Sequence, residues 1–390
     1  MTDPLARWGL TPVINASGTM TDLGASRVSP EVRAVVDAIL ARFVMIDELQ
    51  DRASEVIAQA TGAEAGTIVG SSAAGIAQVI AALLAGEDIA RVEALPASGP
   101  ERPRVIVQAG HLINYGAPVA QAVWMTGAEV DAIGTAARCE LAHMRLALAD
   151  GAAAVLHIVS HHTVREGELP LDLVIAEARA AGVPVIVDMA SEYDLTGPIA
   201  GGAAAAIYSA HKFLGGPTAG IVAGNAALIR AVRAQNAGLG RKMKVGKEGI
   251  AGAMAALDAW ARRDHAAEAA REDGIVAGWE AALAGLTGVA IARHRDWTGN
   301  PITRLELRLT PEAPCFAWEL AARLKSCDPS IHLRDDLAEH GLLYLDPCNV
   351  TEEEAQTVSE AIRATLDAFA RDGTGRKRSW SDVKAGRDAS

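Results

Sequence analysis

Short apolar segments alternate with helical patterns between residues 46 and 255, and this alternation restricts the fold more than any other feature of the sequence. Seven segments have the length and the content of Val, Ile and Ala that are typical of buried strands. They are Gly66–Val69, Arg104–Gln108, Glu129–Ile133, Ala153–Val159, Val183–Asp188, Ala203–Tyr208 and Gly220–Ala223. Such alternation predicts an α/β fold, in which a mainly parallel seven-stranded sheet is flanked by helices on both faces.

The sequence outside this region predicts three further parts. Residues 1–45 are expected to form an N-terminal arm that precedes the large domain of residues 46–255. Residues 256–371 predict a smaller α+β C-terminal domain, entered through one long helix over residues 251–285. The polar, glycine-containing residues 372–390 are expected to form a disordered tail.

Charge and cysteine usage limit the function classes. The net charge is −12, and no stretch of Lys and Arg in the folded part is concentrated enough to bind a nucleic-acid backbone. Residues 65–86 are uncharged, but serines, glycines and a glutamine interrupt them, so they predict a helix inside the protein rather than a membrane span. The four cysteines form no CxxC pair, which favours reduced thiols and a cytoplasmic location.

Two residues at predicted strand ends carry the main chemical hypothesis. Asp188 ends one apolar run, and Lys212 follows the next, 24 positions later. Ligands of open parallel sheets bind beyond the carboxyl ends of the strands. Pyridoxal phosphate requires a lysine amine for its Schiff base and a carboxylate that keeps its pyridine nitrogen protonated. The pair therefore predicts a pyridoxal phosphate site, although a surface salt bridge would also account for these two residues alone.

A second segment is suited to the phosphate of such a cofactor. Gly70-Ser71-Ser72-Ala-Ala-Gly75 follows a predicted strand and begins a helix. Glycine lets the backbone approach an anion, and the helix N-terminus and the serines supply hydrogen-bond donors. Ser209, which precedes Lys212, can reach the same phosphate, and His211 lies next to the lysine. Small residues at a strand–helix turn can also serve packing alone.

Histidines follow two other predicted strands. His111, in Gln108-Ala-Gly-His111, can present a flat ring to a planar cofactor, although a loop histidine with a backbone partner is the commoner case. In Ser160-His161-His162, one ring is expected to face the cofactor. Neither HxxxH nor HExxH occurs, so no metal site is expected. Ser191, just after Asp188, is small enough to leave room beside a ring.

Cationic residues supply candidate contacts to an anionic substrate. Arg241 and Lys247 belong to Gly240-Arg-Lys-Met-Lys-Val-Gly-Lys247, which is either an anion-binding segment or a solvated charged loop. Arg334 follows a predicted strand and can hold a carboxylate in bidentate geometry. An ion pair of Arg334 with Asp335 or Asp336 is the alternative.

These segments together resemble the fold-type I pyridoxal phosphate enzymes, specifically the selenocysteine synthase (L-seryl-tRNA selenium transferase)-like family. The matching segments are Val13-Ile-Asn-Ala-Ser-Gly-Thr, Gly110-His-Leu-Ile-Asn-Tyr-Gly, Gly127-Ala-Glu-Val-Asp-Ala-Ile-Gly-Thr, Val187-Asp-Met-Ala-Ser-Glu, Tyr208-Ser-Ala-His-Lys-Phe-Leu-Gly-Gly-Pro-Thr-Ala-Gly, Arg241-Lys-Met-Lys-Val-Gly-Lys and Leu345-Asp-Pro. The resemblance implies that Lys212 is the Schiff-base lysine and that Asp188 is its pyridinium partner. It also implies that Ser71, Ser72 and Ser209 surround the phosphate. Asn15 and Ser17, in the first segment, and His161 are expected on the substrate side.

The acidic chain is similar to the branch of this family that acts on small molecules, which includes D-glucosaminate-6-phosphate ammonia-lyase. The expected activity is α,β-elimination, with ammonia released and a 2-keto acid formed, on a small amino acid or a phosphorylated amino-sugar acid. A racemase or epimerase is the alternative, and a non-catalytic metabolite-binding protein is the alternative from another class. A nucleotide-dependent enzyme is disfavoured because neither GxGxxG nor GxxxxGK[ST] occurs. The resemblance implies a homodimer or a larger homo-oligomer.

Overall fold

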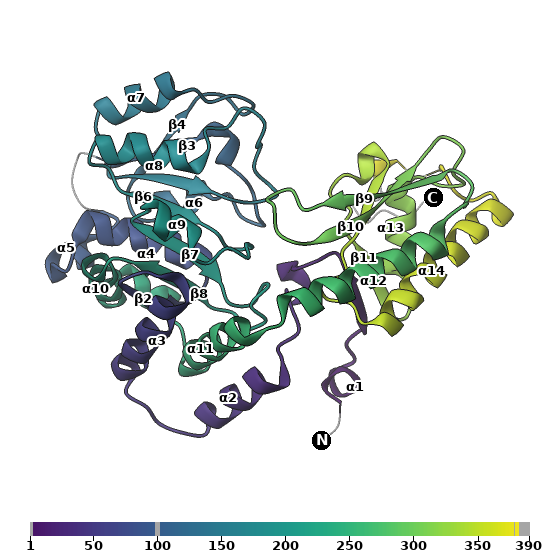
Figure 1. Ribbon diagram of the computed structural model, residues 1–390, viewed down its shortest axis with the longest axis horizontal. Coiled ribbons are helices and arrows are strands. Elements are labelled where there is room, and N and C mark those ends of the chain that lie inside the picture. The colour runs from purple at the N-terminus through teal and green to yellow at the C-terminus, as the bar shows by residue number, and fades with distance from the viewer. Residues whose placement is uncertain (1–2, 98–101, 378, 382–390) are drawn as a thin grey trace. The chain divides into compact units, whose positions relative to one another are not determined.

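The computed structural model describes residues 3–97, 102–377 and 379–381, and the chain divides into two compact units (Figure 1). Unit 1 combines Met1–Ser26 with Asp264–Ser390, and unit 2 is Arg27–Arg263. The predicted N-terminal arm of residues 1–45 is therefore not one part: its residues up to Ser26 belong to unit 1, and the rest belong to unit 2. The boundary before the C-terminal part lies eight residues later than the predicted position after residue 255.

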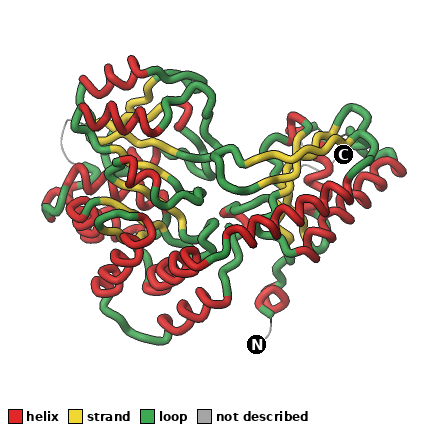
Figure 2. Tube along the Cα trace, viewed as in Figure 1, coloured by secondary structure: helices red, strands yellow, loops and turns green. Residues whose placement is uncertain are grey.

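Unit 2 contains the predicted seven-stranded sheet, which Figure 2 shows in yellow. Its strands are β2 (Ala65–Val69), β3 (Arg104–Gln108), β4 (Glu129–Ile133), β5 (Ala154–Ile158), β6 (Val185–Asp188), β7 (Ala205–Ser209) and β8 (Gly220–Gly224). Their order is β2-β8-β7-β6-β5-β3-β4, and β8 runs in the direction opposite to the other six strands. The mainly parallel sheet predicted from the sequence is thus confirmed.

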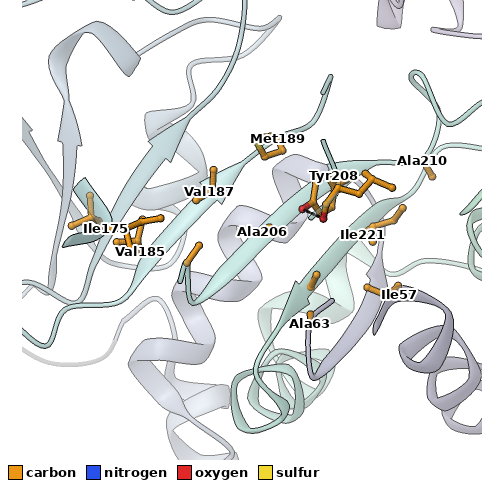
Figure 3. Packing of buried hydrophobic residues seen from close by; sticks show 14 of the residues in the cluster. Ile57, Ala63, Ile175, Val185, Val187, Met189, Ala206, Tyr208, Ala210 and Ile221 are labelled. Carbon is orange, nitrogen blue, oxygen red and sulfur yellow. Dashed lines mark hydrogen bonds between the residues drawn. The ribbon is translucent and has the colours of Figure 1, made fainter. Parts of the chain in front are cut away.

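Alternate residues of each central strand enter two different cores. In β6, Val185 and Val187 belong to one buried cluster, together with Ala206 and Tyr208 of β7 (Figure 3). Ile186 and Ile207, between them in sequence, belong to the other cluster. Because successive side chains of a strand point to opposite faces, both faces of this sheet are buried. Continuous apolar strands are the sequence pattern that such a sheet requires.

The helices of unit 2 supply the other half of each core. They are α2 (Pro30–Leu40), α3 (Ile46–Thr61), α4 (Ser72–Ala85), α5 (Ile89–Ala94), α6 (Ala120–Trp124), α7 (Leu141–Ala149), α8 (Leu171–Ala180), α9 (Gly197–Gly201), α10 (Ala226–Ala234) and α11 (Lys247–Arg262). Helix α4 accounts for the uncharged run of residues 65–86, because most of its residues are buried against the sheet and neighbouring helices. Among the described residues, no helix has both the length and the apolar character needed to cross a membrane.

Unit 1 combines both ends of the chain. Its strands are β1 (Val13–Ala16), β9 (Val289–Arg295), β10 (Thr303–Leu309), β11 (Ser330–Leu333) and β12 (Leu342–Leu345). Strands β9, β10 and β12 form an antiparallel sheet, and β1 pairs in parallel with β11, with Val13 opposite Ser330. The helices are α1 (Pro4–Trp8), α12 (His265–Leu283), α13 (Ala317–Lys325) and α14 (Glu352–Asp372).

The predicted long helix over residues 251–285 is interrupted. Arg263 has extended backbone angles, and Asp264 begins α12 as its N-cap, where Oδ1 accepts a hydrogen bond from Ala267 N–H at 2.9 Å. Aspartate is among the preferred N-cap residues because its side chain satisfies a backbone donor of the first turn. The sequence pattern did not separate the two helices, since both continue with Ala, Arg and Glu.

The start of the predicted disordered tail is ordered. The Glu319 carboxylate accepts hydrogen bonds from the backbone N–H groups of Arg376 at 2.7 Å and Lys377 at 3.0 Å. The Arg376 guanidinium donates to the carbonyls of Ala313 and Thr310. These bonds fix the segment that follows α14, so the prediction of disorder from residue 372 is wrong here. Residues 378 and 382–390 lie outside the described part of the chain.

Candidate active site

The N-terminus of α4 lies at the carboxyl end of β2 and has the features of an anion-binding site. Ser71 is the N-cap, and its Oγ accepts a hydrogen bond from Ala74 N–H at 3.1 Å. A Cβ atom at Gly70 would lie 2.5 Å from the carbonyl oxygen of Met243, and one at Gly220 would lie 2.3 Å from that of Ser71. Both positions therefore require glycine. The first-turn N–H groups and the dipole of this 14-residue helix favour a phosphate.

A cavity of about 360 Å³ opens beside this helix end. Its lining combines small residues at the start of α4 with residues from three other segments. These segments are the loop before α6, α6 with the residue that follows it, and the end of η4 (Leu239–Met243) with the residue that follows it. The lining residues are Gly70, Ser71, Ala73, Ala74, Tyr115, Ala117, Gln121, Ala122, Met125, Met243 and Lys244. The ammonium of Lys244 gives the cavity a positive charge beside the donors of α4.

Asp188, the last residue of β6, is a buried carboxylate. It is 7% exposed, and its Oδ1 accepts a hydrogen bond from Ala190 N–H at 3.2 Å. Burial raises the pKa of Asp188 to about 6, because the charged form loses its hydration, while the positive charge of Lys212 and the bond from Ala190 oppose this rise. A second cation near this carboxylate, such as a protonated ring nitrogen, would favour the ionised form further.

Lys212 lies just beyond the end of β7, the parallel neighbour of β6, in which Ile207 is opposite Asp188. Its Nζ donates a hydrogen bond to Ser191 Oγ at 2.6 Å, so Ser191 orients the amine. Ser209 is buried, with its Oγ 3.2 Å from His211 Nδ1. Burial and the adjacent Lys212 charge both lower the pKa of His211, which keeps its ring neutral.

These groups match the three functional parts of pyridoxal phosphate. The helix N-terminus with Ser71 and Ser72 suits the phosphate, the buried carboxylate of Asp188 suits the pyridine nitrogen, and the Lys212 amine suits the aldehyde. Ser72 is the first residue of α4, next to its cap. The residues present therefore fit the cofactor that the sequence predicts.

His111 does not fit its predicted stacking role. Its side chain is fully buried, its Nε2 lies 2.9 Å from Glu168 Oε2, and its Nδ1 accepts a hydrogen bond from Ile158 N–H at 3.1 Å. The ring also packs edge-on against His157, with ring centroids 4.6 Å apart. No ring face is left open to a cofactor, so that prediction is wrong: His111 joins β3, β5 and the loop that contains Glu168.

His161 and His162 lie in the turn that follows β5, with ring centroids 3.8 Å apart. Ser160 Oγ accepts a hydrogen bond from His162 N–H at 3.2 Å. His161 is half-buried and His162 is exposed, and the contact of His161 with a substrate stays a prediction. Across the described residues, no three His, Cys, Asp or Glu side chains come together in a way that would hold a metal ion.

The two cations predicted to bind substrate in unit 2 have different surroundings. Lys247 Nζ donates to the carbonyl oxygen of Leu40 at 3.0 Å and also to that of Arg42. These two bonds use two of the three N–H donors of the ammonium, and a contact of Lys247 with an anionic substrate stays a prediction. Arg241 is exposed within η4, and its contact with a substrate stays a prediction. Lys244, between them in sequence, lines the cavity.

The other predicted substrate residues belong to unit 1. Asn15 Oδ1 accepts hydrogen bonds from Ser17 N–H at 3.0 Å and from Ser17 Oγ at 2.8 Å, and Asn15 Nδ2 donates to the carbonyl of Gly18 at 2.8 Å. Asn15 and Ser17 therefore stabilise the turn after β1. Any contact of either residue with a substrate stays a prediction.

Arg334 lies in a buried charged cluster of unit 1. Its Nε is 3.3 Å from Asp336 Oδ2, so the ion pair considered as an alternative is present. Its guanidinium lies 5.1 Å from the ring centroid of Trp297, and that of Arg304 lies 5.2 Å from the same centroid. Arg304 is itself neutralised by two carboxylates, those of Asp296 and Asp346. A carboxylate-binding role for Arg334 stays a prediction.

The comparison with known families agrees with this geometry. The family model of L-seryl-tRNA selenium transferase matches residues 13–272, which is more than half of the chain. The chain belongs to the L-seryl-tRNA selenium transferase family. This result confirms the family and the fold-type I architecture predicted from the sequence.

Three members or relatives of the family cover nearly the whole chain. The D-glucosaminate-6-phosphate ammonia lyase of Salmonella typhimurium is 34% identical over 91% of this chain and 95% of its own length. The 5'-C-glycyluridine monooxygenase-decarboxylase of a Streptomyces species is 35% identical over 92% of this chain and 90% of its own. A solved structure of D-glucosaminate-6-phosphate ammonia-lyase superposes with a TM-score of 0.84 at 33% identity, covering 95% of this chain and 100% of that one.

The structure adds three residues to which the sequence analysis gave no role. Tyr115 and Lys244 line the cavity beside the α4 N-terminus, and Glu168 binds His111 from a loop 57 residues away in sequence. Tyr115 lies within the family-like segment Gly110-His-Leu-Ile-Asn-Tyr-Gly, and its position before a glycine predicts a turn. Glu168 has no comparable signal, because its partner is defined only by the tertiary fold.

Proposed function

We propose that the chain is a pyridoxal phosphate-dependent ammonia-lyase that acts on a phosphorylated amino-sugar acid. The observation that carries this proposal is the Lys212 amine beside Ser191, at the same sheet edge as the buried Asp188 carboxylate. A lyase of this type is named both in the Salmonella relative and in the structure with a TM-score of 0.84. The similarity extends over both units of this chain and over nearly the full length of the lyase.

Each site residue has a distinct task in this reaction. The α4 N-terminus with Ser71 and Ser72 binds the cofactor phosphate, and ionised Asp188 holds a proton on the ring nitrogen. When bound, pyridoxal phosphate withdraws electrons from the substrate Cα. The Lys212 amine, oriented by Ser191, accepts the proton from Cα. The Lys212 ammonium gives this proton to the Cβ hydroxyl, which leaves as water. Hydrolysis of the enamine so formed gives a 2-keto acid and ammonia.

The Streptomyces relative supports a second candidate, a decarboxylating oxygenation. Its identity to this chain is 35%, against 34% for the lyase, so similarity alone does not rank the two activities. The two reactions differ in their co-substrate, because a monooxygenase consumes dioxygen and an elimination does not. Dioxygen consumption therefore separates them.

The test is an assay of the purified protein with pyridoxal phosphate and D-glucosaminate 6-phosphate. We expect ammonia and a 2-keto acid in equal amounts, at the same rate in air and under nitrogen. Turnover that requires dioxygen and releases carbon dioxide would favour the second candidate, and recovery of only the inverted substrate would indicate a racemase. A protein that stays colourless with added pyridoxal phosphate would contradict all three.

We further propose that the chain acts as a homodimer, or a larger homo-oligomer, in the cytoplasm. The end of α2 and the segment leading into α3 carry exposed apolar side chains, among them Leu40 at 52%, Phe43 at 105% and Met45 at 72% exposure. Apolar groups gathered on one surface favour burial against another molecule. Cys139 and Cys315 are unpaired and buried, as suits a reducing compartment. Light scattering is expected to give at least twice the 40.5 kDa monomer mass, and a monomer would contradict the assembly.

A further inference from the structure

Tyr115 stands at the tip of a closed turn between β3 and α6. Asn114 Oδ1 accepts a hydrogen bond from Gly116 N–H at 3.0 Å, and Tyr115 N–H donates to the carbonyl of Ala117 at 3.2 Å. A further backbone bond joins Val119 N–H to the carbonyl of Ile113 at 3.0 Å and closes the base of the turn. The Tyr115 backbone is therefore held by local bonds.

Tyr115 is near two groups of the predicted cofactor site, the α4 N-terminus and the Asp188 carboxylate. It lines the 360 Å³ cavity together with Gly70 and Ser71, at the N-terminus of α4. Burial and then the Asp188 carboxylate raise the pKa of Tyr115, so the phenol stays protonated and lies within electrostatic range of Asp188. Tyr115 is thus close both to the helix end that suits the phosphate and to the carboxylate that suits the ring nitrogen.

The other aromatic candidate for this position is excluded by its contacts. His111 is fully buried and bound through both ring nitrogens, to Glu168 and to the backbone of Ile158. Tyr115 is 37% exposed, so part of its ring remains accessible to a ligand in the cavity. Trp124, on α6, is 55% exposed but does not line the cavity.

We propose that Tyr115, rather than His111, is the aromatic side chain that contacts the ring of the bound cofactor. This inference rests on the proposed use of pyridoxal phosphate. The contact is made by the ring, because a flat π surface packs against a planar heteroaromatic ligand and limits its rotation. The phenol oxygen is not required for this contact.

The test is a titration of the apoprotein with pyridoxal phosphate, followed by absorbance and by visible circular dichroism. Aromatic contacts of this kind change an equilibrium constant by roughly 2- to 12-fold beyond the area they bury. We therefore expect Tyr115→Ala to weaken binding by about tenfold and to reduce the circular dichroism of the bound cofactor. Tyr115→Phe is expected to bind within about twofold of the wild type, since it keeps the ring.

Trp124→Ala is the matched control, because it removes an exposed aromatic ring from the same region outside the cavity; its titration is expected to match that of the wild type. Unchanged thermal unfolding of the Tyr115→Ala apoprotein would show that the turn is intact. Wild-type affinity and dichroism in Tyr115→Ala would overturn the inference, as would a loss in Tyr115→Phe equal to that in Tyr115→Ala. If the wild type shows no visible absorbance band after pyridoxal phosphate is added, the proposed cofactor is wrong. The proposed role of Tyr115, which depends on that cofactor, is then wrong as well.

Discussion

Replacing Lys212 by alanine is expected to abolish covalent attachment of pyridoxal phosphate and to lower turnover by about 10³-fold or more. The amine is the group that bonds to the cofactor and that moves the substrate proton, and proton transfer alone contributes roughly 10²–10⁴-fold to the rate. Two measurements check this: ammonia release at saturating substrate, and the mass of the intact protein after borohydride reduction with cofactor. The wild type is expected to gain the mass of the reduced cofactor on Lys212, and the variant to gain none.

Lys377→Ala provides the control for this experiment. Lys377 is exposed in unit 1, and its backbone rather than its side chain binds Glu319. This variant is expected to keep both the activity and the mass increase of the wild type. A reduced adduct on a different lysine in the Lys212→Ala protein would show that Lys212 is not the attachment site.

Replacing Asp188 by asparagine is expected to stabilise the apoprotein at neutral pH. The folded-state pKa of Asp188, about 6, lies above the ordinary value of 3.8, so ionisation of this group opposes folding. The protonated form of Asp188 is the one that the folded state favours. Its contribution to stability is complete below pH 4 and is lost as the pH rises through 6. Two pKa units correspond to roughly 3 kcal/mol. We therefore expect the free energy of unfolding of Asp188→Asn apoprotein at pH 8 to exceed that of the wild type by up to roughly 3 kcal/mol, with no difference at pH 4.

The same substitution is expected to weaken cofactor binding and catalysis. An ionised Asp188 makes a charge-assisted hydrogen bond to a protonated ring nitrogen, and such bonds contribute about 1.5–3 kcal/mol. Affinity for pyridoxal phosphate should fall about tenfold or more, and its decrease as the pH falls through 6 should disappear in the variant. Denaturant unfolding and absorbance titrations from pH 4 to 8 measure both effects.

Asp37→Asn is the control here, because Asp37 is an exposed carboxylate on α2. It is expected to change neither the pH dependence of unfolding nor cofactor affinity. Apoprotein stability that falls equally at pH 4 and pH 8 in Asp188→Asn would mean that lost packing, and not removal of a buried charge, dominates. If Asp188→Asn raises the stability of the apoprotein but lowers cofactor affinity and activity, Asp188 serves catalysis at the expense of stability.

The sequence predicted the parts of the site that depend on local pattern. Asp188 and Lys212 follow apolar runs, and such runs become strands of one sheet whose carboxyl ends share an edge. Ser71 sits where a strand meets a helix, and the structure makes it the N-cap of α4. In each case a few neighbouring residues determine both the conformation and the place of the side chain in the sheet.

The predictions that failed depend on partners far away in the chain. Whether His111 faces a cofactor or the protein interior is decided by Glu168, which lies 57 residues away in the sequence. The segment that holds Arg376 is ordered by distant partners, the Glu319 carboxylate and the carbonyls of Ala313 and Thr310. Sequence periodicity carries no information about such pairs. A polar residue can be placed at a sheet edge from the sequence, but its partner cannot.

The parallel pairing of β1 with β11 has a consequence for synthesis on the ribosome. Val13 is opposite Ser330, so the first strand of unit 1 emerges roughly 300 residues before its partner, which at typical rates of 5–20 residues per second is tens of seconds. Unit 2 is a continuous segment and can fold in that interval. The N-terminal strand meanwhile lacks its partner, and its backbone donors and acceptors stay unpaired by β11 until residues 330–333 have been translated.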